Sequence, residues 1–201
     1  MKQPSTKFGI YSSRIVTETG LFDGTILVKD GVISKLIEGK PHNPDFHLED
    51  LNDLVVMPGI IDSHVHINEP GRTSWEGFET MTKAAIAGGI TSLVDMPLNA
   101  SPVTTNIDAL AKKMDSTEGK LYCNCGFWGG IVPENIADLE ELIKGGVLGI
   151  KAFLTHSGID DFPNVSLNDL ERGMEILKKY KVPLLAHAEL DEEHEGTAIL
   201  E

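Results

Sequence analysis

The sequence is poor in cysteine and contains no long hydrophobic run. Its only two cysteines among 201 residues are Cys123 and Cys125. They lie one residue apart, and a disulfide between positions i and i+2 of a strand needs strained geometry. This usage predicts a reducing, cytoplasmic setting. No window approaches the roughly 20 apolar residues that a membrane-spanning helix needs, and the N-terminus has no apolar signal-peptide core.

Positive charge is also scarce. The formal net charge of −14 leaves no basic excess for nucleic acid or for an anionic membrane surface. No G-x-G-x-x-G motif follows the first apolar strand, so a dinucleotide-binding fold loses its main support. What remains, with 41% apolar and 24% charged residues, is typical of a globular protein.

Residues 1–57 have the pattern of a small N-terminal β-module. Apolar and polar residues alternate on both sides of Asp30-Gly31, a dipeptide that suits a tight hairpin turn. A polar, proline-containing connection follows. We therefore expect a domain boundary near Pro58.

Residues 58–201 follow a different pattern, in which apolar runs alternate with amphipathic segments. The runs predict strands within 55–66, 90–97, 121–128, 147–155 and 182–189, and the segments predict helices within 73–87, 106–116, 133–144 and 166–180. Expected helix starts are Ser74, Pro133-Glu134, and either Ser166 or Asn168. Expected stops are Gly88-Gly89 and Gly145-Gly146. Apolar strands that alternate with helices predict a parallel sheet covered on its faces, in a (β/α)₈ barrel or a doubly wound fold.

Polar residues at the strand ends favour the barrel. The carboxyl ends of the predicted strands carry His64, His66, Asp95, Lys151, His187 and Glu189, and in a barrel this is the active-site face. Residues 58–201 are too few for the about 250 residues of a whole barrel. We therefore expect an α/β fold with about five of eight barrel strands, as the N-terminal part of a larger protein.

His64 and His66 are the first candidate ligands. Side chains at i and i+2 of a strand share a face, so the two imidazoles can chelate one zinc-like metal ion. Asp62 shares that face and can orient a ligand. On spacing alone, two hydrogen-bonded histidines at a strand end are an equally good interpretation.

Lys151 is the second anomaly, because GVLGIKAFL places an ammonium group inside an apolar run. Either the side chain reaches solvent at the strand end, or burial lowers its pKa and leaves a neutral amine. A neutral amine can react with carbon dioxide to give a carbamate, an anionic ligand able to bridge two metal ions. His187, at the end of the fifth run, becomes a candidate ligand for the second metal.

The stretches PGIIDSHVHINEPGR and GIKAFL, together with His187, resemble the metal-dependent amidohydrolase superfamily in its cyclic amidase branch. The longer stretches around Asn68 and after Lys151 resemble the allantoin-hydrolysing members in particular. The resemblance implies an N-terminal β-sandwich module over 1–57, a homotetramer, and two divalent metal ions, with zinc the first expectation. It further implies that a metal-bridging hydroxide opens the ring of allantoin to give allantoate.

The resemblance also assigns roles to single residues. It makes His64 and His66 the pair that binds the more buried metal, Lys151 the carbamylated bridge and His187 the first histidine of the second metal. One further histidine and a general acid/base aspartate are expected beyond Glu201, and His194 is no substitute for that histidine. This chain is therefore expected to hold no catalytic acid/base and to be inactive alone.

The substrate is argued from three candidate contacts. Asn68 stands where dihydroorotase-like members carry an arginine for a carboxylate, so a neutral amide favours a ring without one. Asn99 is a further candidate, and both asparagines are equally acceptable as loop residues. The loop after Lys151 could line the pocket through Thr155, His156 or Ser157, of which Ser157 is the chosen candidate. The alternatives are a hydantoinase/dihydropyrimidinase or dihydroorotase-like cyclic amidase, or a non-catalytic truncated relative.

Overall fold

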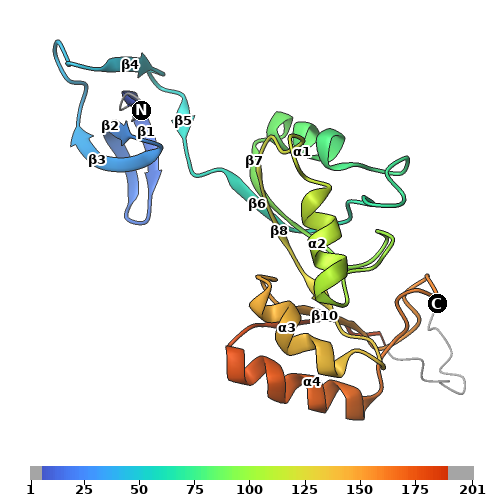
Figure 1. The fold of residues 1–201 in the computed structure, drawn as a ribbon. Coiled ribbons are helices and arrows are strands. Elements are labelled where there is room, and N and C mark those ends of the chain that lie inside the picture. The colour runs from blue at the N-terminus through green and yellow to red at the C-terminus, as the bar shows by residue number, and fades with distance from the viewer. Residues whose placement is uncertain (1–5, 190–201) are drawn as a thin grey trace, which may run out of the picture. The chain divides into compact units, whose positions relative to one another are not determined.

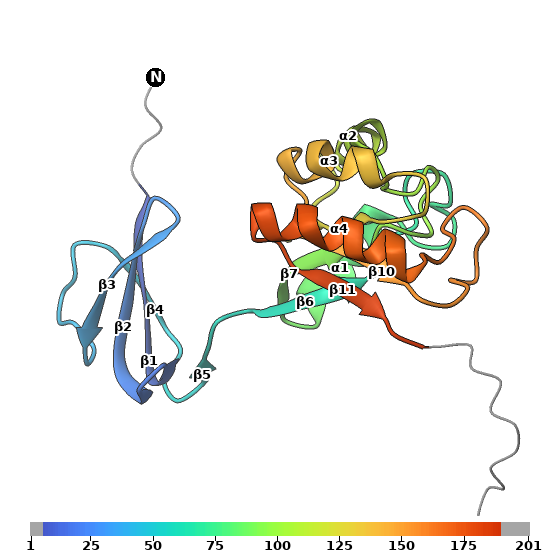
Figure 2. The same ribbon diagram turned by 90° about the horizontal axis from the view of Figure 1, so that it is seen from below.

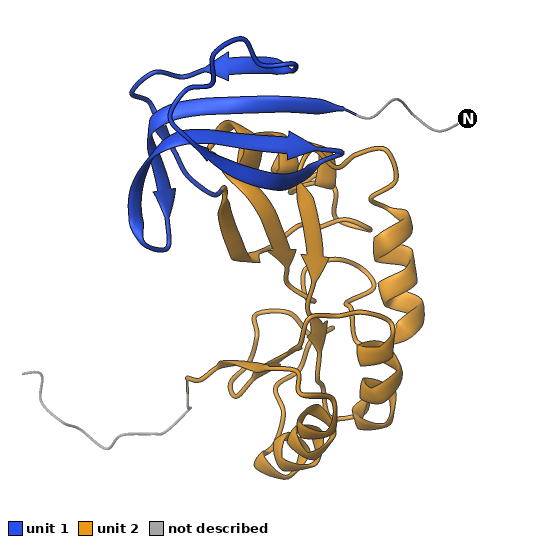
Figure 3. Cartoon of the chain, turned by 90° about the vertical axis from the view of Figure 1, so that its left-hand side faces the viewer, with its two compact units in different colours: residues 1–58 blue, residues 59–201 orange. Residues whose placement is uncertain are grey.

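The computed structural model describes residues 6–189. The chain divides into two compact units, residues 1–58 and residues 59–201 (Figure 3). The predicted change in pattern near Pro58 therefore coincides with a division in the structure.

The first unit is all β. One sheet has the order β3-β2-β1-β4, with β5 also paired to β1 (Figure 1). Its strands are β1 (Lys7–Thr17), β2 (Gly20–Lys29), β3 (Val32–Glu38), β4 (His47–Asp50) and β5 (Val55–Val56). The β2–β3 hairpin turns at Asp30 and Gly31, whose φ angles of 54° and 80° suit this dipeptide. The predicted hairpin is confirmed.

The second unit is built on parallel strands that follow one another in chain order. One sheet contains β6 (Ile60–Val65), β7 (Ile90–Asp95) and β8 (Asn124–Phe127), and the other contains β9 (Gly129–Gly130), β10 (Ile150–Phe153) and β11 (Leu184–His187). Trp128 separates β8 from β9. The amide of Leu148 donates to the Phe127 carbonyl at 2.9 Å, which links the two sheets. The result is a mixed α/β fold with parallel sheets.

Helices connect consecutive strands of the second unit (Figures 1 and 2). They are α1 (Phe78–Ala87), α2 (Ile107–Asp115), α3 (Leu139–Lys144), which a short 3₁₀ turn η1 (Ile136–Asp138) precedes, and α4 (Leu167–Tyr180). Helix α4 begins at the predicted Ser166, whose hydroxyl accepts the Asp169 amide. Helices α1 and α3 end at Gly88 and Gly145, and the next residues, Gly89 and Gly146, have positive φ as predicted. Among the described residues, no helix is long and apolar enough to cross a membrane.

Two predicted helix starts are wrong. Ser74 lies in a turn, and α1 begins only at Phe78, whose amide donates to Glu69, nine residues earlier in the same loop. Pro133 and Glu134 also lie in a turn, which the Asn135 side chain organises by accepting the Val132 amide at 2.8 Å.

The core of the second unit consists of three clusters of buried residues. One of them, which includes Val65, Ile67 and Phe78, joins β6 to α1. The other two lie around β10, all four residues of which are buried. One cluster packs β10 against the helices that follow it, and includes Leu142, Ile150 and Leu177. A second cluster, which includes Met96, Trp128 and Phe153, lies at the strand ends. Burial around β10 fixes the end of the sheet from which Lys151 projects.

Candidate active site

The histidine pair lies at the end of β6. The ring centroids of His64 and His66 are 5.5 Å apart, with their planes tilted by 48°. Desolvation by burial, and then the neighbouring charges of His64 and Lys151, lower the pKa of His66. A neutral imidazole is the form that binds a metal ion. The carboxylate of Asp62 accepts the backbone N–H of His64 at 3.0 Å, so it orders the strand end itself.

Lys151 and His187 approach each other through Phe153. Lys151 is 4% exposed, and its Nζ lies 4.8 Å from the centroid of the Phe153 ring. His187, at the end of β11, stacks its ring on Phe153 of β10, with 5.0 Å between the two ring centroids. Burial lowers the pKa of Lys151, which favours the neutral amine. Strands β10 and β11 thus bring these two candidate ligands to one end of their sheet.

The described residues include no group of three or more His, Cys, Asp or Glu side chains placed to hold a metal ion. His64 and His66 are a pair, and the charges of two buried lysines, Lys151 and Lys113, contribute to lowering the pKa of His66. His194 lies outside the described residues.

Asn68 is buried, and its Oδ1 has no hydrogen-bond partner within the described part of the chain. Its backbone is satisfied, since its amide donates to the Glu76 carbonyl at 3.1 Å and its carbonyl accepts the Arg72 amide at 2.8 Å. A buried amide oxygen without a partner costs free energy.

Asn99 and Ser157 lie in different surroundings. The Asn99 Nδ2 atom is 3.5 Å from His66 Nδ1, and its backbone has φ 75°. The Asn99 side chain therefore reaches the histidine pair. The Ser157 hydroxyl contacts the carbonyls of its own loop, at 2.6 Å from Phe162 O and 3.1 Å from Ile159 O. Its proposed substrate contact remains a prediction.

Arg72 joins three strand-end loops, a role that the sequence gave no reason to expect. Its Nη1 donates to the Asn99 carbonyl at 2.9 Å, and its Nη2 pairs with Asp161 at 3.1 Å. These contacts connect the loops after β6, β7 and β10. The loops that carry Asn68, Asn99 and Ser157 are thereby tied together.

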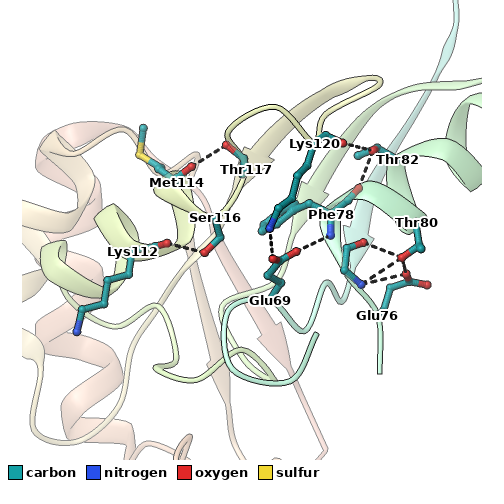
Figure 4. A network of polar contacts seen from close by, with 11 residues as sticks. Glu69, Glu76, Phe78, Thr80, Thr82, Lys112, Met114, Ser116, Thr117 and Lys120 are labelled. Atoms are coloured by element: carbon teal, nitrogen blue, oxygen red, sulfur yellow. Dashed lines mark hydrogen bonds and ion pairs between the residues drawn. The ribbon is translucent and has the colours of Figure 1, made fainter. Parts of the chain in front are cut away.

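Glu69 anchors the loop after β6 through contacts with Phe78 and Lys120 (Figure 4). Glu69 is 7% exposed, forms an ion pair with Lys120 and accepts the Phe78 amide at 3.0 Å. A carboxylate at the first turn of a helix satisfies a free N–H group and the helix dipole. The loop is thus attached to the start of α1 directly after Asn68.

Two further contacts hold the backbone around the histidine pair. Trp128 Nε1 donates to the Ser63 carbonyl at 2.8 Å. Asp95 accepts the Ile67 amide at 2.6 Å and pairs with the buried Lys113 at 2.6 Å. Burial raises the pKa of Asp95 to about 6, against the opposing effect of Lys113. Asp95 was visible in the sequence as a charge at the end of an apolar run, but Lys113 looked like a surface lysine.

Comparisons with known proteins agree on one family. The sequence profile described as "Amidohydrolase family" matches residues 55–201. Allantoinase from Arabidopsis thaliana is 44% identical over 96% of this chain, and allantoinase from Saccharomyces cerevisiae is 43% identical over 92%. Both alignments cover 39% of the relative, so the chain spans about two fifths of the length of these curated relatives.

Solved structures show the same fold. L-hydantoinase (dihydropyrimidinase) from Arthrobacter aurescens matches with a TM-score of 0.86 and 27% identity, over 92% of this chain and 41% of that one. A dihydroorotase matches with a TM-score of 0.59 and 19% identity, over 92% of this chain and 52% of that one, which is a likeness of fold alone.

Proposed function

Because the chain belongs to the amidohydrolase family, we propose that it is part of a metal-dependent enzyme that hydrolyses the cyclic amide of allantoin to allantoate. The observation that carries this proposal is the histidine pair at the end of β6, where the charge of the buried Lys151 contributes to lowering the pKa of His66. In the adjoining loop, the Asn68 oxygen has no partner among the described residues. Relatives named allantoinase, at 43–44% identity, support the choice of substrate.

The finer architecture belongs to the same proposal. Residues 58–201 would form the first part of a (β/α)₈ barrel, and residues 1–57 part of a β-sandwich. The parallel strands in chain order and the high TM-score to a hydantoinase support this assignment. By the same resemblance we propose a homotetramer in the cytoplasm, although one relative bears the name "Allantoinase, mitochondrial".

The side chains fit a pair of divalent metal ions. His64 and His66 offer two imidazole nitrogens, Lys151 offers a carbamate once its amine is neutral, and His187 offers a third imidazole. Zinc is the first expectation because it prefers nitrogen and oxygen ligands of this kind. When bound, such ions lower the pKa of a coordinated water and polarise a carbonyl group.

The remaining residues bind and orient the ring. Asn68 offers its free amide oxygen to a ring N–H, and Asn99 lies beside His66 to contact the same ring. The loop that carries Ser157 would line the site as well. A neutral Asn68 suits a ring that lacks a carboxylate, because no positive charge would be left unpaired. The general acid/base is expected outside residues 1–201.

The test is a substrate panel. The protein, in the longest form that its gene encodes, is assayed with allantoin, dihydrouracil and dihydroorotate. We expect turnover of allantoin with the largest kcat/KM, and activity that is lost on chelation and restored by Zn²⁺. The 201-residue chain alone is expected to be at least about 100-fold less active, since a general acid/base contributes roughly 10²–10⁴-fold.

A second candidate is hydrolysis of dihydropyrimidines or hydantoins, which the TM-score of 0.86 to an L-hydantoinase favours. A larger kcat/KM for dihydrouracil than for allantoin would replace the first candidate with the second. Absence of any turnover, with metal bound, would favour a non-catalytic relative.

A further inference from the structure

A single residue, Ile67, connects His66 to Asn68. The Ile67 side chain is fully buried, and its backbone amide donates to Asp95 Oδ1 at 2.6 Å. The regular pairing of β6 with β7 ends two residues earlier, where Val65 pairs with Asp95. The Asp95 side chain therefore continues the hydrogen bonding between β7 and this segment past Val65, where β6 ends.

The backbone ladder does not fix the histidine pair by itself. The register between β6 and β7 shifts between Asp62 and Val65, so three steps along β6 correspond to two along β7. His64 lies within this irregular stretch. A hydrogen bond just past it, at Ile67, restores a fixed point on the far side of His66.

The other oxygen of Asp95 is held by Lys113 of α2. Lys113 Nζ lies 2.6 Å from Asp95 Oδ2 and 3.0 Å from the Met96 carbonyl, and both charged side chains are at most 1% exposed. A buried ion pair contributes little to net stability, because desolvation offsets the attraction of the charges. A charged acceptor makes a shorter and stronger hydrogen bond than a neutral one. The ion pair therefore adds little net stability, but it gives the Ile67 amide a strong and well-placed hydrogen-bond acceptor.

We propose that the buried Asp95–Lys113 pair is a positioning device that fixes the peptide between His66 and Asn68. It would keep the metal-binding imidazole and the substrate-binding amide in one relative geometry, with α2 as the rigid support. The roles of His66 and Asn68 rest on the proposed function. The fixing of the Ile67 peptide does not.

The test compares two double variants that both remove the buried charges. Asp95→Asn/Lys113→Met keeps an amide oxygen that can accept the Ile67 N–H. Asp95→Leu/Lys113→Met has similar volume and no acceptor. Should the leucine variant fail to fold, Asp95→Ser/Lys113→Met replaces it, because a serine hydroxyl is too short to reach the same amide.

The first measurement is hydrogen exchange at the Ile67 amide. We expect slow exchange in the wild type and in the asparagine variant, and exchange at least about 10-fold faster in the leucine variant as that bond is lost. The Val165 amide, which donates to the Phe153 carbonyl at 3.0 Å and has neither substituted residue as a neighbour in the chain, is the internal control and should not change. Equal exchange of Ile67 in the two variants would overturn the proposal.

The second measurement is the affinity for Co²⁺ alone, by spectroscopic titration. The leucine variant should bind roughly 10–100-fold more weakly than the wild type, and the asparagine variant about as tightly, in line with the loss of an outer support of a metal ligand. Lost protection of Ile67 with unchanged Co²⁺ affinity would show a merely structural role and overturn the proposal. A wild type that binds no Co²⁺ would contradict the proposed function, whereas the exchange data would still decide whether the pair holds the peptide.

Discussion

Strands β6 and β10 bring candidate ligands to the site by different means. Strand β10 pairs with β9 and β11 on its two sides, and all four of its residues are buried. Strand β6 pairs within the described residues only with β7, and its Ile60 and Ile61 are 51% and 67% exposed. Packing therefore fixes Lys151. The end of β6 is held by the burial of Val65 and Ile67 and, in addition, by hydrogen bonds with Asp95 and Trp128.

The difference separates two kinds of precision. Close packing on both faces restricts a side chain through its strand, so the position of Lys151 follows from the core. The beginning of β6 is exposed and lacks this constraint. At the end of the strand, hydrogen bonds to particular backbone groups add to the packing of Val65 and Ile67. Substitutions in the core of β10 should thus affect stability, and substitutions around β6 should affect ligand binding.

The largest effect is expected for Lys151→Met. It should abolish metal-dependent activity and weaken metal binding by more than the roughly 10–100-fold that loss of an outer-shell partner costs. The melting temperature should hold or rise, because an apolar side chain replaces a buried amine. Metal content and thermal unfolding measure the two effects, with the exposed Lys144→Met as the matched control. Full metal content in the Lys151 variant would refute its role as a ligand.

The variants Ile150→Ala and Ile61→Ala test directly whether β10 is packed more tightly than the beginning of β6. Ile150 is fully buried in β10, so its truncation should lower the free energy of unfolding by about 2–5 kcal/mol. Ile61 lies exposed on β6, and its truncation should change the free energy of unfolding by at most about 0.5 kcal/mol. Denaturant unfolding of the two variants decides the matter, and equal losses would mean that β6 is packed as tightly as β10.

A smaller effect is expected for Glu69→Gln, which keeps an oxygen for the Phe78 amide and removes the charge paired with Lys120. The loss should be about 1 kcal/mol of stability, as for a weakened helix N-terminus. The exposed Glu79→Gln, which breaks an ion pair on the surface of α1, is the control. If both variants lose the same stability, Glu69 has no special part in anchoring the loop after β6.

The smallest effect is expected at Glu140, on the surface of the helices that cover β10. Hydrogen bonds from Lys144, Tyr180 and Lys179 lower the pKa of Glu140 to about 2. A carboxyl whose folded pKa lies below its unfolded value stabilises the fold above about pH 4.5, and this contribution disappears as the pH falls towards 2. The wild type should therefore be slightly more stable than Glu140→Gln at pH 7, with the difference gone near pH 2. A difference that persists in acid would exclude the ion pairs as its cause.

The sequence could predict those features that depend on local chemistry. The Asp30-Gly31 turn and the glycine stops of α1 and α3 follow from backbone conformations that few residues adopt. The alternation of apolar runs predicted the parallel strands, and Lys151 stood out as a charge in one of them. The late start of α1 could not be foreseen, because Glu69, which accepts the Phe78 amide, lies nine residues before it, outside the spacing of a local cap.

The supports of the site were hidden for a similar reason. Lys113 follows another lysine on an amphipathic helix, so its sequence neighbours indicate a solvated face. Only the packing of α2 against β7 shows that the side chain is buried against Asp95. Long-range pairs of this kind leave no periodic pattern in one sequence.

The most direct test of the central claim is ¹³C NMR of the protein loaded with Zn²⁺ and ¹³C-bicarbonate. If Lys151 bridges two metal ions as a carbamate, a carbamate carbon signal appears in the wild type and is absent from Lys151→Met. A metal-loaded wild type without that signal would contradict the account of the site.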